Sequence, residues 1–300
     1  MPFAPTPGWL NWERDRAHPA VELPTGSVDA HCHVFGPGDV FPYAPTRKYT
    51  PCDASKQDLF RLHEDLGIAR RVMVQATCHG TDNAALLDVL AADPAASRGV
   101  VSVSSDITDE ELARMHEQGV RGVRFNFVKR LVDHSPVAEL MLISEKIRAF
   151  GWHIVIYFEA ADLPDLESFL ADLPVPLVVD HMGRPDVSES STGAEFSRFI
   201  SFVDKTSAWV KVSCPERLSH SGPFARKGNT DIYDDVVPFA RRVISEFPDH
   251  VLWGTDWPHP NLKSHMPDDA VLLNYLAQIT DSDAQLRRVL VDNPTALYWA

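Results

Sequence analysis

The sequence predicts a single (β/α)8 barrel of the TIM type, for two reasons. Eight short apolar runs, most of them rich in Val and Ile, recur along the 300 residues, and most gaps between them hold a stretch with helical spacing. Parallel strands that alternate with helices can close into a barrel in which every strand edge is paired. A doubly wound open sheet is the alternative, but it would usually show a glycine-rich turn after its first strand, and none follows here.

The N-terminal stretch is predicted to be an arm on the surface. Residues 1–26 are rich in proline and show no sustained period, so the barrel is expected to fill residues 27–300. The arm has no basic leader followed by an apolar stretch, and no run is long enough to span a bilayer, so a cytoplasmic location is expected. Because C-x-x-C spacing is missing, we expect reduced thiols at Cys32, Cys52, Cys78 and Cys214.

The predicted strands follow in order along the chain. They are SVDAHCHVF from Ser27, RVMVQAT from Arg71, RGVVSVS from Arg98, GVRGVRFNF from Gly119, WHIVIYF from Trp152, PLVVDHM from Pro176, WVKVS from Trp209 and VLWGTDW from Val251. Helical spacing occupies several of the gaps, namely 55–66, 83–92, 109–118, 136–150 and 233–247.

Two loops, 36–54 and 259–266, are longer than the fold needs. Loops that follow the strands of a barrel build the rim of its active site, so both are candidates for substrate contact. The serine-rich segment 187–193 is interpreted as an ordinary solvated loop.

The formal net charge of −14 argues against nucleic acid or an anionic membrane surface as a partner, because either would need a basic stripe. Arginines nevertheless recur near the candidate site residues. The electrostatic potential in a pocket is set mainly by the charges that line it, so a chain with a negative net charge can still bind a small anion there. The sequence leaves open whether the chain forms homo-oligomers.

The strongest local feature is the pair of histidines in DAHCH. His31 and His33 are two residues apart on a predicted strand, so their side chains point to the same side. In a barrel they would face the interior near the end where catalytic groups lie. Two core histidines satisfied by hydrogen bonds are the alternative, but two inward imidazoles are costly to bury without a partner.

Two further polar residues end predicted strands. His181 ends the sixth, and Asp256 ends the eighth, where the flanking Trp253 and Trp257 predict partly apolar surroundings that can raise the basicity of the carboxylate. Capping of the next turn is the structural alternative for Asp256. Because these groups and the two first-strand histidines lie at the same ends of three strands, one catalytic site is predicted.

Motifs along most of the chain resemble a known family. DAHCHVFGP, VQATCHGTDNAALL, RGVRFNFVKRLVD, HIVIYFEA, DHMGRPD, CPERL and WGTDWPHPN are similar to segments of the amidohydrolase superfamily and, within it, of the 2-pyrone-4,6-dicarboxylate lactonases. The resemblance covers nearly the whole chain after Pro24. The His-x-His and Asp pattern identifies only the superfamily. RFNFVKRLVD and WPHPN point more narrowly, to the 2-pyrone-4,6-dicarboxylate lactonases.

The resemblance also bears on metals. The superfamily commonly binds one or two divalent ions, but here the fourth strand ends in Arg124, Phe125 and Asn126 without a bridging lysine, and Tyr157 replaces the expected histidine of the fifth. A binuclear site is therefore not expected. The lactonases that the chain resembles require no metal, so none is expected. The alternative is a single zinc held by His31, His33, His181 and Asp256.

Arginines predict how a substrate would bind. Arg124 and Asn126 share one face of a strand, and guanidinium groups hold carboxylates through paired hydrogen bonds. By resemblance, Arg124 and Arg130 bind substrate carboxylate. Arg217, just past the seventh predicted strand, is a further candidate, and the resemblance adds Tyr49, Thr77, Tyr157 and Asn261 as substrate-binding residues. A surface or ion-pair role is the alternative for Tyr49 and Arg217. Arg184 and His79 could also line the rim.

The resemblance implies reversible hydrolysis of 2-pyrone-4,6-dicarboxylate to 4-oxalomesaconate, a step in the bacterial breakdown of lignin-derived aromatic compounds through protocatechuate. In the predicted mechanism, Asp256 is the general base, and the three histidines polarise the carbonyl group. The alternatives are a zinc-dependent decarboxylase of an aromatic or muconic acid, a lactonase for another carboxylated or sulfonated lactone, and a barrel that only binds or senses an aromatic acid.

Overall fold

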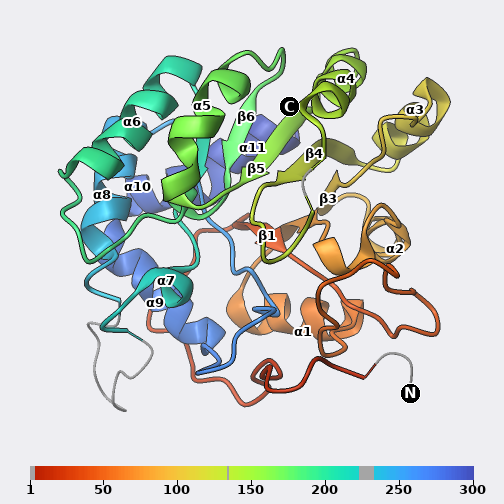
Figure 1. Cartoon of the computed structure of the whole chain (residues 1–300). Helices are drawn as coiled ribbons and strands as arrows, with labels where there is room; N and C mark the ends of the chain where they lie inside the picture. The colour runs from red at the N-terminus through yellow and green to blue at the C-terminus, as the bar shows by residue number, and fades with distance from the viewer. Residues whose placement is uncertain (1–3, 134, 223–232) are drawn as a thin grey trace.

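The computed structural model describes residues 4–133, 135–222 and 233–300, and within them eight parallel strands form one sheet in sequence order. Helices surround the sheet (Figure 1). The strands are β1 (Val28–Cys32), β2 (Arg70–Val74), β3 (Ser97–Val101), β4 (Val120–Asn126), β5 (His153–Tyr157), β6 (Leu177–Val179), β7 (Trp209–Lys211) and β8 (Val251–Leu252). Every predicted apolar run overlaps one of them, with β2 and β3 each beginning one residue before the run, and the predicted barrel is confirmed.

The first and last strands meet and close the sheet. The amide of Ala30 in β1 donates to the carbonyl of Trp253 at 2.9 Å, and the amide of Asp256 donates to the carbonyl of His31 at 2.8 Å. We call this junction the β1–β8 seam. It places the end of β1 directly beside the turn that carries Asp256, although the two segments lie at opposite ends of the sequence.

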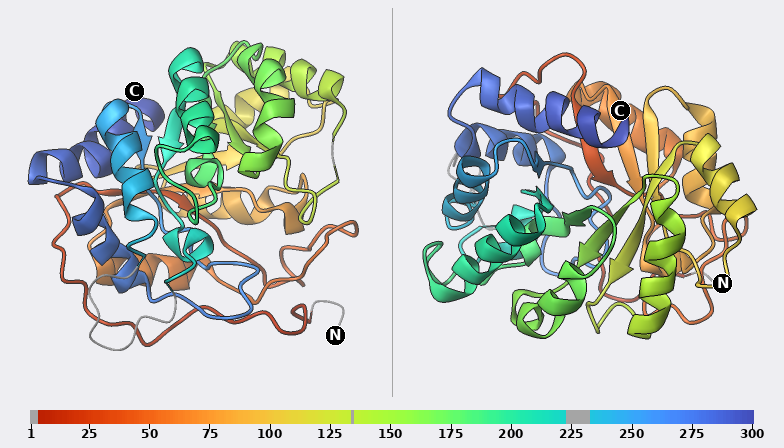
Figure 2. Two further views of the ribbon diagram at one scale, coloured as in Figure 1. Left: turned by 60° about the vertical axis from the view of Figure 1, so that its left-hand side comes forward. Right: turned by 90° about the horizontal axis from the view of Figure 1, so that it is seen from above.

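The helices pack on the outside of the barrel (Figure 2). Ser55 caps the first of them through the Asp58 amide, and the helix ends at Gly67 in the left-handed conformation that glycine adopts readily. The described helices are α1 (Lys56–Leu66), α2 (Ala84–Ala92), α3 (Asp109–Glu117), α4 (Val137–Arg148), α5 (Leu163–Ala171), α6 (Ala194–Thr206), α7 (Pro215–Leu218), α8 (Val237–Glu246), α9 (Asp269–Ile279), α10 (Asp283–Arg287) and α11 (Asn293–Tyr298). Residues 187–193 form turns and bends, as predicted.

The barrel has a packed interior. Inward side chains from six of the strands form a cluster with Tyr298 of α11, which is fully buried. The members of this cluster are Val28, Ala30, Val72, Val74, Val100, Val155, Val178, Leu252 and Tyr298. The polar site residues therefore lie at the carboxyl ends of the strands, next to this apolar cluster.

The N-terminal segment runs across the loops before the barrel begins. Residues 4–27 contain no helix or strand, and residues 1–3 of the predicted arm lie outside the described residues. The Leu10 amide donates to the Leu262 carbonyl at 2.9 Å, so the arm touches the long loop after β8. In Figure 1 the red N-terminal segment passes along the lower side of the molecule. Among the described helices, none has the length and apolar character needed to cross a membrane.

Candidate active site

The structure brings the four predicted catalytic residues together. Oδ1 of Asp256 lies 3.2 Å from Nε2 of His33, 3.4 Å from Nε2 of His31 and 3.9 Å from Nε2 of His181. All four side chains are buried. One carboxylate oxygen and three imidazole nitrogens thus surround a space at the ends of β1, β6 and β8.

The other oxygen of Asp256 is held by an arginine. Nε and Nη2 of Arg217 lie 2.8 Å and 2.7 Å from Oδ2. Burial alone would raise the pKa of Asp256, but Arg217 and the nearby imidazoles hold this pKa well below its usual range. The expectation that Trp253 and Trp257 raise the basicity of Asp256 is therefore wrong, because the charge of Arg217 outweighs the apolar surroundings.

Each histidine has a second partner that fixes its ring. Nδ1 of His33 lies 2.6 Å from the carbonyl oxygen of Val74, and because a carbonyl only accepts, Nδ1 of His33 carries a proton. Nδ1 of His181 lies 2.9 Å from Oγ of Ser213.

Burial lowers the pKa of His181 to about 4 and that of His31 well below its usual value, so both rings are neutral at neutral pH.

The turns that carry the site residues contain unusual backbone conformations. His181, Cys214 and Asp256 have φ angles of 51°, 61° and 61°, in the left-handed region that side chains with a Cβ rarely adopt. Such residues cost about 1–3 kcal/mol each and persist where the surrounding structure fixes them. Their occurrence after β6, β7 and β8 fits a site that depends on the exact direction of these side chains.

Sequence reasoning missed two buried charged residues beneath the histidines. Nζ of Lys211 in β7 lies 3.0 Å from Nδ1 of His31 and 3.1 Å from Oδ1 of Asp180. Oδ2 of Asp180 accepts from Arg124 at 2.9 Å. Lys211 and Asp180 are fully buried. The available signal was a lysine inside the apolar run WVKVS, where a charge is unexpected.

All seven predicted substrate-binding residues line one pocket of about 390 Å³ with three of the four predicted catalytic residues. The seven are Tyr49, Thr77, Arg124, Arg130, Tyr157, Arg217 and Asn261. Arg184 is linked to this pocket through the hydroxyl of Tyr157 at 3.2 Å. His79 does not line it, because its ring packs on Tyr43 and faces the carbonyl of Pro42.

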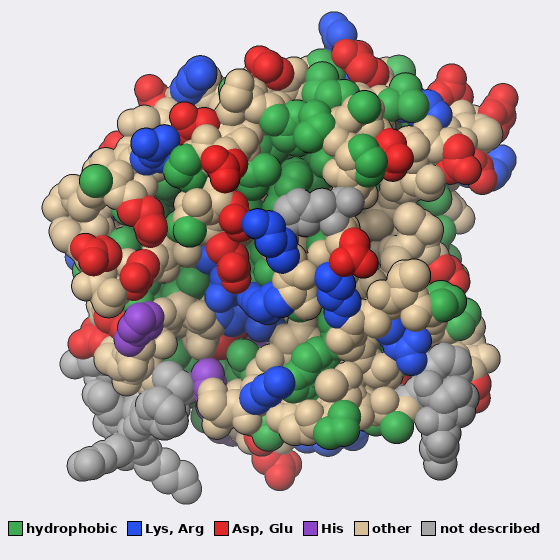
Figure 3. Space-filling view, in the orientation of Figure 1, with side chains coloured by type: hydrophobic (Ala, Val, Ile, Leu, Met, Phe, Trp, Pro, Cys, Tyr) green, Lys and Arg blue, Asp and Glu red, His purple; other side chains and the backbone are tan. Residues whose placement is uncertain are grey.

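An acidic residue at the rim faces two arginines. Oε1 of Glu159 lies 3.4 Å from Nε of Arg130 and 3.8 Å from Nε of Arg184. The side chains of Arg130 and Glu159 are 48% and 44% exposed. On the face shown in Figure 3, Lys and Arg side chains gather near the centre with acidic side chains beside them, despite the net charge of −14.

Two loops of the site are tied together by His259. Nε2 of His259 lies 3.0 Å from Oδ1 of Asp269, and Nδ1 lies 3.6 Å from Oε1 of Glu216, the residue before Arg217. Burial alone would lower the pKa of His259, but Asp269 and Glu216 raise it to about 10. The next residue, Pro260, accepts from Arg217 at 2.8 Å. A buried imidazolium thus connects α7 to the loop after β8.

The profile of the amidohydrolase family matches residues 28–299 of the chain. The chain belongs to the amidohydrolase family. The predicted resemblance to this superfamily is confirmed, and the match spans the barrel from its first strand to its last helix.

Relatives of this amidohydrolase include enzymes that act on lactones. A 2-pyrone-4,6-dicarboxylate hydrolase of Comamonas testosteroni is 57% identical over 99% of this chain and 98% of its own. A 4-sulfomuconolactone hydrolase of Rhizobium radiobacter is 35% identical over 95% of this chain and 94% of its own. A solved apo structure from Agrobacterium tumefaciens is 27% identical, with a TM-score of 0.81 over 94% of this chain and 98% of its own.

The metal that the superfamily resemblance implies can be compared with the ligand atoms of this amidohydrolase. Those of His31, His33 and Asp256 lie within 4.8 Å of one another, and two imidazole nitrogens with a carboxylate oxygen suit zinc. Nε2 of His31 is buried and has no hydrogen-bond partner among the described residues. By donor type and spacing, these three residues fit one metal ion.

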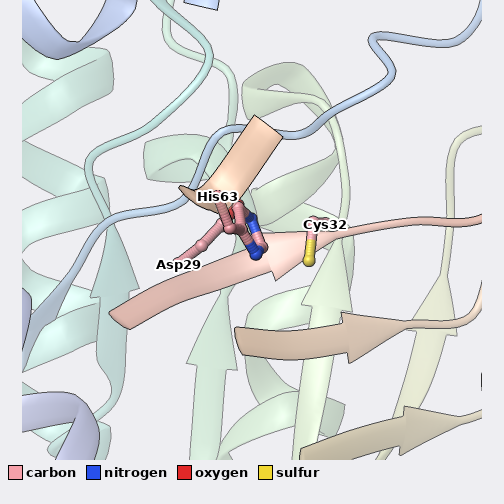
Figure 4. Close-up of side chains that lie close together, drawn as sticks. All are labelled: Asp29, Cys32 and His63. Atoms are coloured by element: carbon pink, nitrogen blue, oxygen red, sulfur yellow. The ribbon is translucent and has the colours of Figure 1, made fainter. Parts of the chain in front are cut away.

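A second cluster with ligand-type side chains is a completed hydrogen-bond network. Figure 4 shows Asp29 and Cys32 on β1 beside His63 of α1. The Asp29 carboxylate accepts from His63 Nε2 at 3.0 Å, the Thr255 hydroxyl at 2.6 Å, and the amides of His31 and Thr255 at 3.0 Å each. Because its oxygens are satisfied by four donors, Asp29 fits a structural role at the β1–β8 seam better than a metal site.

Proposed function

We propose that this amidohydrolase opens the ring of 2-pyrone-4,6-dicarboxylate by reversible hydrolysis to 4-oxalomesaconate. The observation that carries the proposal is a pocket that joins a carboxylate–imidazole cluster to Arg124, Arg130 and Arg217. Guanidinium groups suit a substrate with two carboxylates better than a neutral lactone. The name of the relative with 57% identity supports the same substrate. The reaction would belong to the cytoplasmic breakdown of lignin-derived aromatic compounds.

The proposed chemistry uses Asp256 as the general base. Its carboxylate takes a proton from water while the water oxygen attacks the lactone carbonyl carbon, and the carbonyl oxygen gains negative charge. N–H groups of His31, His33 and His181 stabilise that charge, and each well-placed donor contributes a few kcal/mol. When the ring C–O bond breaks, Asp256 returns the proton to the departing enolate oxygen.

Substrate binding would also change the surroundings of Asp256. Arg217 donates to Asp256 and at the same time lines the pocket. A substrate carboxylate therefore competes with Asp256 for the guanidinium group. As Arg217 turns toward the substrate, the general base regains basicity when the water is in place.

A metal is not needed for these steps, and zinc is the alternative to be tested. If a metal were bound, His31, His33 and Asp256 would hold it, and it would supply polarisation of the carbonyl oxygen. We expect exhaustive chelation, checked by elemental analysis, to leave turnover unchanged. Loss of turnover that zinc restores would support the metal-dependent alternatives, including the decarboxylase.

The direct test is incubation with the pyrone dicarboxylate while the ring absorbance is followed in the ultraviolet. Wild type should open the ring, and Asp256→Asn should bind the diacid but lose about 10²–10⁴-fold in kcat, because the general base is gone. Asp249→Asn is the matched control, since this aspartate is exposed and precedes β8 at the other end of the barrel. Unimpaired turnover in Asp256→Asn would remove Asp256 from the mechanism.

The same assay should include a sulfonated muconolactone, because the relative with 35% identity is named for that substrate and arginines also bind sulfonates. Faster turnover of the sulfonated lactone would reassign the substrate while keeping the reaction class. Binding of both acids without ring opening would favour a barrel that only binds an aromatic acid.

A further inference from the structure

We propose that Lys211 is a positioning residue that fixes His31 as the tautomer with its proton on Nε2. The inference rests on the juxtaposition of the buried Lys211 ammonium and Nδ1 of His31 at 3.0 Å. The functional consequence depends on the proposed lactone hydrolysis, but the tautomer itself is a property of the free protein.

The surroundings of Lys211 leave its ammonium group few partners. Its side chain is 0% exposed, as is that of Asp180, whose Oδ1 lies 3.1 Å from Nζ. Nζ of Lys211 thus forms a buried ion pair with Asp180, and an ammonium group has only donors to offer. Nδ1 of His31 must then accept, and in a neutral imidazole the proton lies on Nε2.

A competing partner is close to the same nitrogen. Oδ1 of Asp180 lies 3.1 Å from Nδ1 of His31 and could accept from it in the other tautomer. However, Oδ1 of Asp180 has no partner with hydrogen-bond geometry among the described residues, whereas the contact between Lys211 and His31 has that geometry. The hydrogen-bond geometry at Nδ1 of His31 therefore favours Lys211 as the donor. The carboxylate of Asp180 acts on Lys211 and His31 through its charge.

The inferred tautomer gives the histidines different tasks. Nε2–H of His31 faces the space beside Oδ1 of Asp256, 3.4 Å away, where a substrate carbonyl oxygen would gather charge. His33 is held differently, because its Nδ1 donates to the carbonyl of Val74 and its Nε2 is hydrogen-bonded to Oδ1 of Asp256 at 3.2 Å. His31 is thus the first-strand histidine whose Nε2 has no hydrogen-bond partner among the described residues, and Lys211 directs the proton of the ring to that atom.

The network also reaches the substrate-binding side of the pocket. Asp180 binds Lys211 through one oxygen and Arg124 through the other, at 2.9 Å. The proposed carbonyl donor and the proposed carboxylate-binding arginine are therefore anchored to the same buried carboxylate. Lys211 lies outside the pocket lining, so its loss should act through His31 and not through substrate contact.

The test measures the protonated ring nitrogen of His31 by nitrogen NMR on the full chain with labelled histidine, and His31→Asn assigns the signals. Wild type should show the proton on Nε2 of His31. In Lys211→Met the ring should turn to the tautomer that donates from Nδ1 to Asp180. Lys211→Gln keeps an N–H donor and should recover part of the wild-type signature. Lys205→Met, at an exposed lysine of α6, should change nothing.

Turnover of the pyrone dicarboxylate provides the second measurement. Lys211→Met should lower kcat about 10²-fold, the loss expected for one oxyanion donor, with KM within about threefold of wild type. A wild-type His31 with its proton on Nδ1, or an unchanged tautomer in Lys211→Met, would overturn the inference. The wild-type spectrum needs no folded variant. If the chain does not open the pyrone, the proposed function fails while the tautomer result stands.

Discussion

Glu159 is the residue that a carboxylated substrate would have to displace at the rim. Its carboxylate lies between Arg130 and Arg184, and Arg184 in turn contacts the hydroxyl of Tyr157. The free protein thus keeps its rim arginines partly neutralised. Because the pair of Arg130 and Glu159 is nearly half exposed, it is worth only about 0–1 kcal/mol.

Glu159→Gln should therefore release Arg130 and lower KM for the dicarboxylate by about two- to fivefold, while kcat stays near wild type. Steady-state kinetics at low and high salt measure both constants, and the difference should shrink as salt screens the charges. Glu145→Gln is the control, since Glu145 forms an exposed pair with Arg148 on α4. A raised KM in Glu159→Gln would mean that Glu159 orients Arg130 for binding instead.

Among the elements, β1 and the segment after β8 depend on each other most directly. Asp29 accepts from the amides on both sides of the β1–β8 seam, and His63 of α1 supports it from outside. Nδ1 of His63 accepts from Arg71 at 3.2 Å, so its Nε2 carries the proton that Asp29 receives. The carboxylate of Asp29 therefore faces donors alone.

Replacing Asp29 with Asn should weaken the seam, because the amide nitrogen adds a donor where only donors are present. We expect Asp29→Asn to lower the free energy of unfolding in urea by about 3 kcal/mol, the range for a lost charged hydrogen bond with an unsatisfied buried group. Asp204→Asn, at an exposed position of α6, is the control and should be neutral. Equal stability of the two variants would show that the seam does not need this carboxylate.

At the scale of the whole molecule, the buried imidazolium of His259 makes stability depend on pH. Its folded pKa of about 10 lies above the usual value of 6.5 because Asp269 and Glu216 face it, although Arg217 also lies beside Glu216. A raised folded pKa contributes stability that is complete below pH 6.5 and is lost as pH rises through about 10. The full contribution is on the order of 5 kcal/mol.

Urea unfolding between pH 6 and about 10.5 tests this dependence. The free energy of unfolding of wild type should fall across that window by more than that of His259→Gln, which lacks the titrating group. His18→Gln, at an exposed histidine, should follow wild type. Parallel curves for wild type and His259→Gln would exclude His259 as the source.

The sequence predicted positions along strands better than partners across the barrel. Apolar runs located all eight strands because burial on both faces selects Val and Ile within each run. The basicity of Asp256 was mispredicted because its partner, Arg217, lies 39 residues earlier, whereas Trp253 and Trp257 are visible beside it. Lys211 was missed because its acceptor, His31, is 180 residues away and no local pattern pairs β7 with β1.

The β1–β8 seam also determines when a refolding chain becomes active. Asp29 and Thr255 are 226 residues apart, so this contact forms only after nearly the whole chain is in place, and such distant pairings are slow. A barrel still missing its last strand could have most of its helices and much of its apolar interior, yet His31 would have no Asp256 beside it. Recovery of turnover should therefore lag behind recovery of helical circular dichroism.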